Sequence, residues 1–519
     1  MLVAPAFEYL SVEFLGRVLR EGGHEVALAY DPQLFNDSFL GSPWLARLFH
    51  HGDEVADRIA GFEPDLVAFS VLSRNMDWAT DLVARVRART SAPIVFGGNH
   101  PSSAPVETIR RTGIDAVVVG EGEWAFLAMA DRIAAGEDLR GAPNVVWLDP
   151  QTGETHRNAL APLETDVARF GWPLKDLYYD QHDFFRIGYF TVTSRGCIHS
   201  CSYCYPHVYR NLYGVGGGRF YRRRPVDDVI AELKWAKANV EPCMIRFSDD
   251  TFSFNPAWLA EFADKYPRAV GIPFWCFVTP DSVTPEVADS LARAGCAEVE
   301  MGVQTLDPRV RAEVIQRTED TADVARTIRL FRERGLRVST DYILNVPGQS
   351  EDELRDMVRF FLEANPTRVN TFWMDIFPNT DIYRYATREG FIDAAHAERI
   401  AAGDGVKGLI RGGWGESRLA EQFQMQVFLM NFLPARVIET MIERRLYAYL
   451  PYLGHFFTYA AHYGLSYLTR QPKNDLYSRH VQARYRHYVT RRVQRWIGLA
   501  PRAAESPLVP AGGREPRSA

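Results

Sequence analysis

The feature that most restricts the fold of this chain is a regular alternation of short β-branched runs with amphipathic helical stretches, in two separate series. In the first series the strand-like runs are HEVALAY, DLVAFSV, APIVFGG and DAVVVG, and helical stretches such as WATDLVARVRART lie among them. Strands that alternate with helices in this way form parallel sheets with helices on both faces. We therefore predict a doubly wound, Rossmann-like α/β domain over residues 1–150.

The second series begins at Gly188. Its strand-like runs lie near residues 188–193, 243–248, 273–278, 297–303, 337–345 and 368–376. Six βα units are fewer than the eight that close a full barrel, so we predict an open, partial (β/α)6 barrel over residues 188–400. In such folds the functional side chains gather at the carboxyl ends of the strands.

Three further segments complete the predicted organisation. Residues 151–187 have irregular spacing, with Pro162 and Pro173, and are interpreted as a linker. Residues 401–502 have helical periodicity and are predicted to cap the barrel and shape substrate choice. Residues 503–519 are rich in Pro, Gly and charge, which is typical of a disordered tail.

Composition narrows the class of protein. A chain of 519 residues with 46% hydrophobic residues is long enough for two or three cores. The 59 basic and 65 acidic residues leave a net charge of -6, which gives no overall attraction to nucleic acid or to an anionic membrane. The sequence also has no run of 18 apolar residues and no secretory signal pattern. We expect a multi-domain cytoplasmic enzyme that contacts neither nucleic acid nor a membrane.

Three of the six cysteines stand together in the stretch SRGCIHSCSYCYPH, directly after the strand-like run GYFTVT. Thiolates so close together, Cys197, Cys201 and Cys204, favour metal ligation over disulfides. A four-iron cluster held by three cysteines keeps one iron open to an external ligand. The alternative is a structural zinc site completed by His207, although the sequence has no second ligand cluster of the kind such sites usually use.

The motif C-x-x-x-C-x-aromatic-C after the first strand of a partial barrel resembles the radical S-adenosylmethionine (SAM) superfamily, with Tyr203 at the aromatic position. The resemblance implies a 4Fe-4S cluster whose open iron binds the amino and carboxylate groups of SAM. One electron from the cluster, supplied by a reductant such as flavodoxin or ferredoxin, would then cleave SAM to methionine and a 5'-deoxyadenosyl radical.

Other positions at strand ends also resemble this family. They are Ser248, Asp249 and Asp250 after the second barrel strand, Gln304 and Thr305 after the fourth, and Gly348 after the fifth. The resemblance implies that these segments, together with Tyr203, hold SAM. The alternative for each segment is an ordinary polar turn at a strand end.

The first domain has its own candidate ligand site. Its strand ends carry Ser70, Leu72, Gly97 and Gly98, where a doubly wound fold binds ligands. This pattern resembles cobalamin-binding domains. The segment Gly120-Glu121-Gly122-Glu123 resembles one that is common in cobalamin-dependent radical enzymes. The resemblance implies a cobalamin held by Ser70, Leu72, Gly97, Gly98, Gly120 and Glu121. The alternative is a degenerate domain without a cofactor.

Two details qualify this assignment. The first loop, APAFEYLSVEF, lacks the Asp-x-His-x-x-Gly motif of other cobalamin domains, so we expect no histidine below cobalt and interpret His24 as structural. The basic run of Arg219, Arg222, Arg223 and Arg224 suits either a solvated loop or pairing with a carboxylate or phosphate, and we favour the solvated loop.

The resemblance implies a C-methyltransferase acting on an unactivated carbon of a small-molecule or natural-product intermediate. One SAM would generate the radical, methylcobalamin would donate the methyl group, and a second SAM would recharge cobalt. The sequence identifies no catalytic acid or base. The alternatives are a radical cyclase or ring-rearranging enzyme similar to the anaerobic magnesium-protoporphyrin ester cyclase, and a non-catalytic zinc or iron-sulfur sensor.

Overall fold

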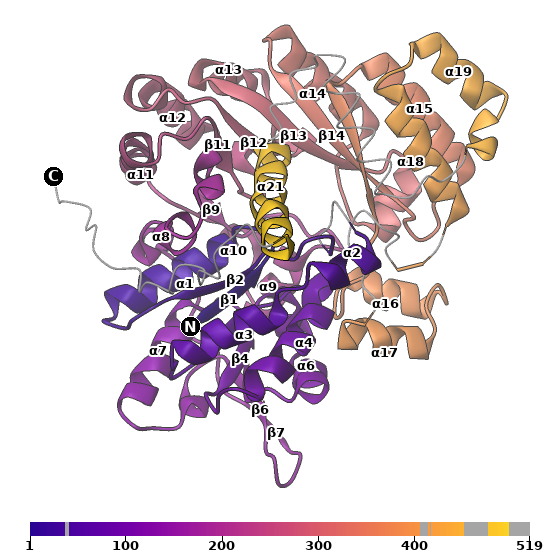
Figure 1. The fold of residues 1–519 in the computed structure, drawn as a ribbon. Coiled ribbons are helices and arrows are strands. Elements are labelled where there is room, and N and C mark those ends of the chain that lie inside the picture. Colours follow the sequence, from indigo (N-terminus) through magenta and orange to yellow (C-terminus); the bar gives the residue numbers. More distant parts are fainter. Residues whose placement is uncertain (37–40, 405–413, 416, 451–475, 498–519) are drawn as a thin grey trace.

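The computed structural model describes residues 1–36, 41–404, 414–415, 417–450 and 476–497 (Figure 1). The tail that we predict to be disordered, residues 503–519, lies outside the described residues. Within the described part, a mostly parallel sheet and a fully parallel sheet, with their helices, account for most of the molecule, and a set of helices follows them. This arrangement confirms the predicted fold class.

The first sheet has the strand order β2-β1-β3-β4-β5-β6-β7. Its strands are β1 (Leu2–Pro5), β2 (Leu28–Asp31), β3 (Val67–Ser70), β4 (Ile94–Gly97), β5 (Ala116–Val118), β6 (Val145–Leu148) and β7 (Thr155–Arg157). The strands β1 to β5 are parallel and almost fully buried, as expected for continuous apolar runs covered on both faces. The last two strands are antiparallel, and β7 extends the sheet past residue 150 into the segment interpreted as a linker.

Helices cover both faces of this sheet. One face packs against α1 (Leu10–Glu21) and α7 (Glu123–Ala134). The other packs against α3 (Gly52–Gly61), α4 (Met76–Arg87) and α6 (Pro105–Thr112). Two shorter helices, α2 (Pro43–Leu48) and α5 (Asn99–Ser103), belong to connections. The loops at the carboxyl ends of β1, β3, β4 and β5 therefore lie together at one edge of the domain.

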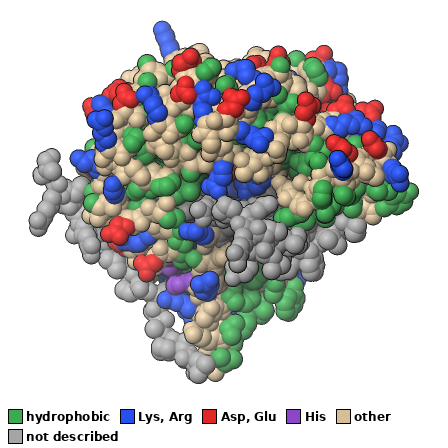
Figure 2. All heavy atoms as spheres, turned by 90° about the horizontal axis from the view of Figure 1, so that it is seen from above, with side chains coloured by type: hydrophobic (Ala, Val, Ile, Leu, Met, Phe, Trp, Pro, Cys, Tyr) green, Lys and Arg blue, Asp and Glu red, His purple; other side chains and the backbone are tan. Residues whose placement is uncertain are grey.

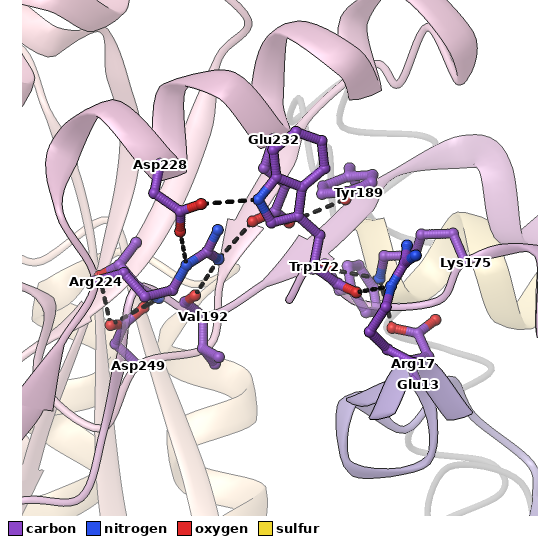
Figure 3. A network of polar contacts seen from close by, with 12 residues as sticks. Glu13, Arg17, Trp172, Lys175, Tyr189, Val192, Arg224, Asp228, Glu232 and Asp249 are labelled. Carbon is purple, nitrogen blue, oxygen red and sulfur yellow. Dashed lines mark hydrogen bonds and ion pairs between the residues drawn. The ribbon is translucent and has the colours of Figure 1, made fainter. Parts of the chain in front are cut away.

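The segment between the sheets packs closely against both of them. It contains α8 (Asp176–Tyr179) and, just before this helix, the buried Lys175. The ammonium group of Lys175 donates to Glu13 on α1 (2.8 Å), and Figure 3 labels both residues. It also donates to Glu8 (2.5 Å) and to the carbonyl of Phe190 in the first barrel strand (2.6 Å). Burial raises the pKa of Glu13, although the neighbouring Lys175 opposes the shift. The segment therefore ties the two sheets together.

The second sheet has the order β15-β14-β13-β12-β11-β8, and all its strand pairs are parallel. Its strands are β8 (Tyr189–Thr191), β11 (Ile245–Phe247), β12 (Phe274–Val278), β13 (Cys296–Gln304), β14 (Arg337–Leu344) and β15 (Arg368–Trp373). The outer helices are α11 (Val226–Asn239), α12 (Pro256–Ala269), α13 (Pro285–Ala294), α14 (Thr321–Glu333) and α15 (Glu351–Ala364). Each strand overlaps a predicted one, and the sheet is the open six-stranded partial barrel that the sequence predicts.

An insertion after β8 carries the cysteine motif. A short ribbon pairs β9 (Ser194–Arg195) with β10 (Arg222–Arg223), and the cysteines lie between these two strands in the chain. The last cysteine, Cys204, directly precedes α9 (Tyr205–Tyr213), and α10 (Gly217–Phe220) follows. The ribbon and α9 thus hold the two ends of the cysteine loop.

The C-terminal helices are α16 (Asp381–Arg388), α17 (Ala394–Ala402), α18 (Arg418–Met430), α19 (Ala435–Glu443) and α21 (Leu476–Trp496). Helices α18 and α19 pack on α15, at the outside of the barrel. Helix α21, yellow in Figure 1, packs against the interdomain segment, which is the segment between the two sheets, and against loops of the first domain. No helix of the described part is both long enough and apolar enough to span a membrane.

Charged side chains of both signs are interspersed over the face seen in Figure 2. This mixture agrees with the small net charge of -6.

Candidate functional site

A cavity of about 420 Å³ lies between the first sheet and the cysteine-bearing insertion of the barrel. The first domain contributes all of the residues expected at a cobalamin site: Ser70, Leu72, Gly97, Gly98, Gly120 and Glu121. The barrel side contributes Arg195, Gly196, Tyr205, Pro206, Tyr209, Phe220 and Asp250. Residues chosen from separate strand ends are therefore brought together around one space.

Two glycines in the cavity lining lie tightly against neighbouring segments of the protein. Gly98 has a φ of 108°, and a Cβ atom there would lie 2.6 Å from the carbonyl oxygen of Val71. Gly120 has a φ of 85°, and a Cβ atom there would lie 2.5 Å from the hydroxyl oxygen of Tyr213. Only glycine suits these positions, because a side chain would collide with the loop after β3 or with helix α9. As lining residues, these glycines also add no side chain to the cavity, which suits a bulky ligand that lies against the main chain.

Helix α9 presents a row of tyrosines to the first domain. Tyr205, Tyr209 and Tyr213 are spaced by four residues and therefore share one helix face. Their contacts reach the loops after three different strands: Tyr205 bonds to Ser73 (2.9 Å), Tyr209 donates to Asn99 and Ser102 (3.2 Å each), and Tyr213 accepts from the backbone of Glu121 (2.9 Å). Because α9 begins directly after Cys204, the cysteine loop is docked onto the wall of the cavity.

The three cysteines are free, half-buried thiols. Burial raises the pKa of Cys197 to about 11, and the nearby Asp250 adds to this shift. Burial also raises the pKa of Cys204, where the neighbouring Cys201 and Cys197 thiols contribute as well. Each thiol makes ionisation of the others less favourable, because three thiolates would repel one another. Bound iron would offset these negative charges, so the group suits an iron-sulfur cluster. In the described part of the chain, no three His, Cys, Asp or Glu side chains form a ready-made metal cage.

The alternative zinc ligand, His207, has other partners. Its Nε2 lies 2.9 Å from Asp381 and 3.2 Å from the Asn211 amide, and its Nδ1 lies 2.9 Å from Arg210. Both ring nitrogens are therefore engaged by side chains outside the cysteine loop. The geometry does not favour a Cys3His zinc site.

The two aspartates after β11 point in different directions. The Asp249 carboxylate is buried and accepts from the backbone and hydroxyl of Thr193 (3.0 and 2.7 Å) and from the Ser194 hydroxyl, so it fixes the chain ahead of the cysteines. Asp250 instead lines the cavity. Desolvation by the surrounding protein and the negative charge of Asp249 together raise its pKa to about 6. The neighbouring Ser248 continues the strand pairing, with its amide bonded to the carbonyl of Thr191 (2.8 Å).

The remaining residues expected around SAM lie at the carboxyl ends of the later strands. Gln304 has a φ of 68° and folds its amide over Gly302. The Thr305 hydroxyl is buried and donates to Glu353 on α15, so it faces the protein interior. The carbonyl of Gly348 accepts from Arg309 (2.9 Å).

Tyr203 packs in the apolar cluster around Val310 and Val346. A hydrogen bond joins it to Arg317, a residue whose positive charge also acts on the Cys201 thiol. Tyr203 therefore lies between the cysteine loop and the later barrel strands.

Sequence reasoning missed the role of the arginine run. Arg222 is buried and forms a two-point ion pair with Glu121. Arg224 is also buried and bonds to Asp228 and Glu232 (Figure 3). Only Arg219 is exposed, so the interpretation of the run as a solvated loop is wrong for its other members. The clue available was the acidic Gly-Glu-Gly-Glu segment, but its distance in sequence hid the pairing.

Two family models match the chain. The radical SAM superfamily model covers residues 191–361, and the B12 binding domain model covers residues 6–130. The fold and these matches define a radical SAM enzyme, which uses SAM and a 4Fe-4S cluster. Because the first domain is a B12-binding domain, the chain belongs more particularly to the cobalamin-dependent radical SAM enzymes.

Relatives extend over most of the chain. An uncharacterised methyltransferase of Pyrococcus horikoshii is 25% identical over 342 residues, which is 64% of this chain and 72% of the relative. The cytidylyl-2-hydroxyethylphosphonate methyltransferase of Streptomyces wedmorensis is 22% identical over 438 residues, 74% of this chain and 78% of the relative. The solved cobalamin-dependent radical enzyme OxsB has the same fold, with a TM-score of 0.63 at 14% identity over 96% of this chain and 80% of that one.

Proposed function

We propose that this enzyme methylates a carbon atom of a polar small molecule, using cobalamin and SAM together. The observation that carries the proposal is the cavity between the sheets, because residues from the cobalamin domain and from the segments next to the cysteine loop line the same space. Methyl transfer through two cofactors needs them close together. The methyltransferase relatives support the same reaction class.

The proposed roles follow from the positions of the residues. Cys197, Cys201 and Cys204 would hold a cluster, which supplies one electron and an open coordination position when bound. Ser70 lies at the cavity next to Ser11, with 3.4 Å between their hydroxyl oxygens, and would meet the polar tail of cobalamin. Gly97 and Gly98 would let the corrin approach the main chain, since both line the cavity without a side chain.

The later strand ends supply the proposed SAM contacts. Tyr203, Ser248, Asp250, Gln304 and Gly348 would form this site, with Asp250 between SAM and the cobalamin cavity. Asp249 and Thr305 are better described as supports, because each side chain already bonds to protein groups. Their task would be to hold the neighbouring backbone in place.

The inner face of the barrel suggests a polar substrate. Along β13, Val299 and Met301 are buried in the core between the sheet and its outer helices. Glu298 and Glu300 alternate with them and therefore lie on the opposite face of the sheet, where they are half-buried. Asp341 of β14 shares that face. Burial raises the pKa of Glu300 and raises that of Asp341 to about 6. Hydrogen-bonding groups of this kind suit a small molecule with polar substituents.

The test is anaerobic reconstitution with iron, sulfide and hydroxocobalamin, followed by visible spectroscopy and an assay of products formed from SAM under reduction. We expect four-iron absorbance, retained cobalamin, 5'-deoxyadenosine and S-adenosylhomocysteine. A cluster with cleavage but no cobalamin would remove the methyl-transfer mechanism. A cyclase would give 5'-deoxyadenosine without S-adenosylhomocysteine, and zinc without cleavage would indicate a sensor.

The cluster ligands are tested separately. We expect Cys201→Ala to abolish SAM cleavage and to retain hydroxocobalamin binding, because the residues proposed to hold cobalamin, such as Ser70 and Gly98, belong to the first domain. Cys243→Ala is the matched control, since Cys243 is a free, exposed thiol at the amino end of β11 and should be dispensable. Cleavage by Cys201→Ala at the control rate would contradict the cluster assignment.

A further inference from the structure

The Gly-Glu-Gly-Glu segment pairs both of its carboxylates with arginines of the barrel insertion. Glu121 receives two parallel bonds from the guanidinium of Arg222, at 3.0 and 2.5 Å. The side chain of Arg222 is only 4% exposed, and it also donates to the carbonyl of Glu164 (2.7 Å). A two-point Arg-carboxylate pair fixes both distance and orientation.

The second carboxylate repeats this arrangement. Glu123 is buried and lies 2.6 Å from the guanidinium of Arg195. That guanidinium stacks on the ring of Phe170, 4.2 Å from its centroid, and lies near Phe14 at 4.9 Å. The stacking restricts the conformation of the Arg195 side chain and so disfavours pairing with another residue.

The two arginines are neighbours in the ribbon of the barrel insertion. Arg195 on β9 is paired in register with Arg222 on β10. The chain then runs from Arg195 through Gly196 to Cys197, so the ribbon holds the first cysteine. On the other side, Gly120 and Gly122 line the cavity next to the paired glutamates. The two ion pairs therefore connect the cavity wall with the start of the cysteine loop.

Stability alone does not account for this arrangement. Burying an ion pair adds little net stability, since the desolvation of both charges offsets their attraction. Buried pairs do impose one geometry, because any other arrangement leaves a charge without its partner. Here both pairs join the two cofactor-bearing parts of the molecule at the same ribbon.

We propose that Glu121 and Glu123 are positioning residues, which set the separation of the cobalamin and cluster sites by holding Arg222 and Arg195. The proposal rests on the proposed function, since it assumes that both cofactors work together. It differs from the family resemblance in one respect: the side chain of Glu121, a residue that lines the cavity, is engaged by Arg222 of the barrel insertion and acts on the position of that insertion.

The test compares Glu121→Gln and Glu123→Gln with the wild type in the reconstituted holoenzyme. The amide keeps the shape of the side chain but loses the charge. We expect 5'-deoxyadenosine formation to stay within about twofold, whereas S-adenosylhomocysteine from the first turnover falls about tenfold or more, because misplacement by about 1 Å can cost 10²-fold in rate. The control is Glu137→Gln, which breaks an exposed pair with Arg132 inside the first domain (2.9 Å).

A second readout needs no turnover. Hydrogen exchange of the cofactor-free protein should rise in peptides covering residues 120–123, 194–195 and 222–223, and should stay unchanged in the Glu137→Gln control. Arg222→Lys keeps the charge but loses the two-point contact, so an intermediate effect on both readouts is expected.

The outcomes separate the two proposals. An equal fall of both SAM products, or no selective loss of S-adenosylhomocysteine, would overturn the positioning role. If the wild type itself makes 5'-deoxyadenosine but no S-adenosylhomocysteine, the proposed methyl transfer fails instead. If the glutamine variants do not fold, Arg222→Lys decides the question by the same product ratio.

Discussion

Asp375 is a buried carboxyl group that follows the last barrel strand and has no assigned role. Its residue is 5% exposed, and no hydrogen bond to its carboxylate is found within the described residues. Burial raises its pKa to about 7, partly opposed by the charge of Arg74 in the loop after β3. A buried carboxyl without a donor is costly when ionised.

This residue should make stability depend on pH. The folded protein keeps a proton on Asp375 that the unfolded chain releases above pH about 4, so stability falls as the pH rises from about 4 to 7. Asp375→Asn cannot titrate and should be more stable than the wild type by up to about 4 kcal/mol above pH 7, with little difference at pH 4. Urea unfolding at both pH values checks this. Asp352→Asn, on an exposed side chain, should show no such difference.

At the residue scale, the sequence predicts which residues lie at strand ends more reliably than it predicts where their side chains point. Cys201 and the cavity glycines follow from motif and strand pattern, because a strand end fixes where the backbone lies. Asp249 and Asp250 are adjacent, yet one bonds to Thr193 and the other faces the cavity. Such a choice depends on partners far along the chain. The pairing of Arg222 with Glu121 spans 101 residues and has no local signal.

At the element scale, one of the three tyrosine contacts that dock α9 depends on a glycine. The tyrosine face of α9 meets the loop after β5, where Gly120 leaves room for the hydroxyl of Tyr213. Gly120→Ala should lower stability by about 2 to 4 kcal/mol, since a positive φ and an overpacked contact each cost about 1 to 2 kcal/mol. We also expect weaker hydroxocobalamin binding, because the displaced helix forms part of the cavity wall.

A matched glycine separates these two costs. Gly113 has a φ of 66°, but a Cβ atom there would meet nothing within 4 Å. Gly113→Ala should therefore show the backbone cost of about 1 to 2 kcal/mol alone and leave hydroxocobalamin affinity unchanged. Chemical denaturation and an absorbance titration measure both quantities. Equal effects of the two substitutions would contradict the proposed contact with Tyr213.

Most elements could be predicted because their periodicity is strong. Each barrel strand lies within or overlaps a predicted segment, and the helices between them have clear apolar faces. The hairpin of β6 and β7 was the exception at the end of the first sheet. Its second strand, Thr155–Arg157, has no buried face, so the alternation that reveals strands is missing there.

At the scale of the whole molecule, α21 joins distant parts of the chain. Arg484 is fully buried and donates to the carbonyl of Ala6, which lies 478 positions earlier. His487 of the same helix packs against His182 of the interdomain segment, and His480 packs against the neighbouring Phe184 and Phe185. The sequence predicts this helix, but we assigned the region to capping the barrel, because periodicity identifies an apolar face and not its partner.

The histidines should make this docking sensitive to acid. Burial lowers the pKa of His182 and of His480 to about 3, and that of His487 to about 4. The three imidazoles stay neutral while α21 is docked. When α21 is undocked, they take up protons below pH about 6.5, so the docked state loses stability as the pH falls through 6.5 toward 4.

Hydrogen exchange of α21, corrected for the intrinsic rate, should therefore rise between pH 7 and pH 5. Peptides from α11, which contains no histidine, serve as the internal control. If α21 and α11 respond alike, the effect is global and the histidine contact is not its cause.

The ion pairs between the Gly-Glu-Gly-Glu segment and the barrel ribbon also constrain recombination among relatives. A chimera that takes its first domain from one enzyme and its barrel from another inherits each half of both pairs from a different parent. Glu121 and Arg222, and likewise Glu123 and Arg195, would have to be matched across the junction. We therefore expect an exchange of domains to succeed only where the acidic residues of one parent match the arginines of the other at these two ion pairs. Similar cofactor pockets alone would not be enough.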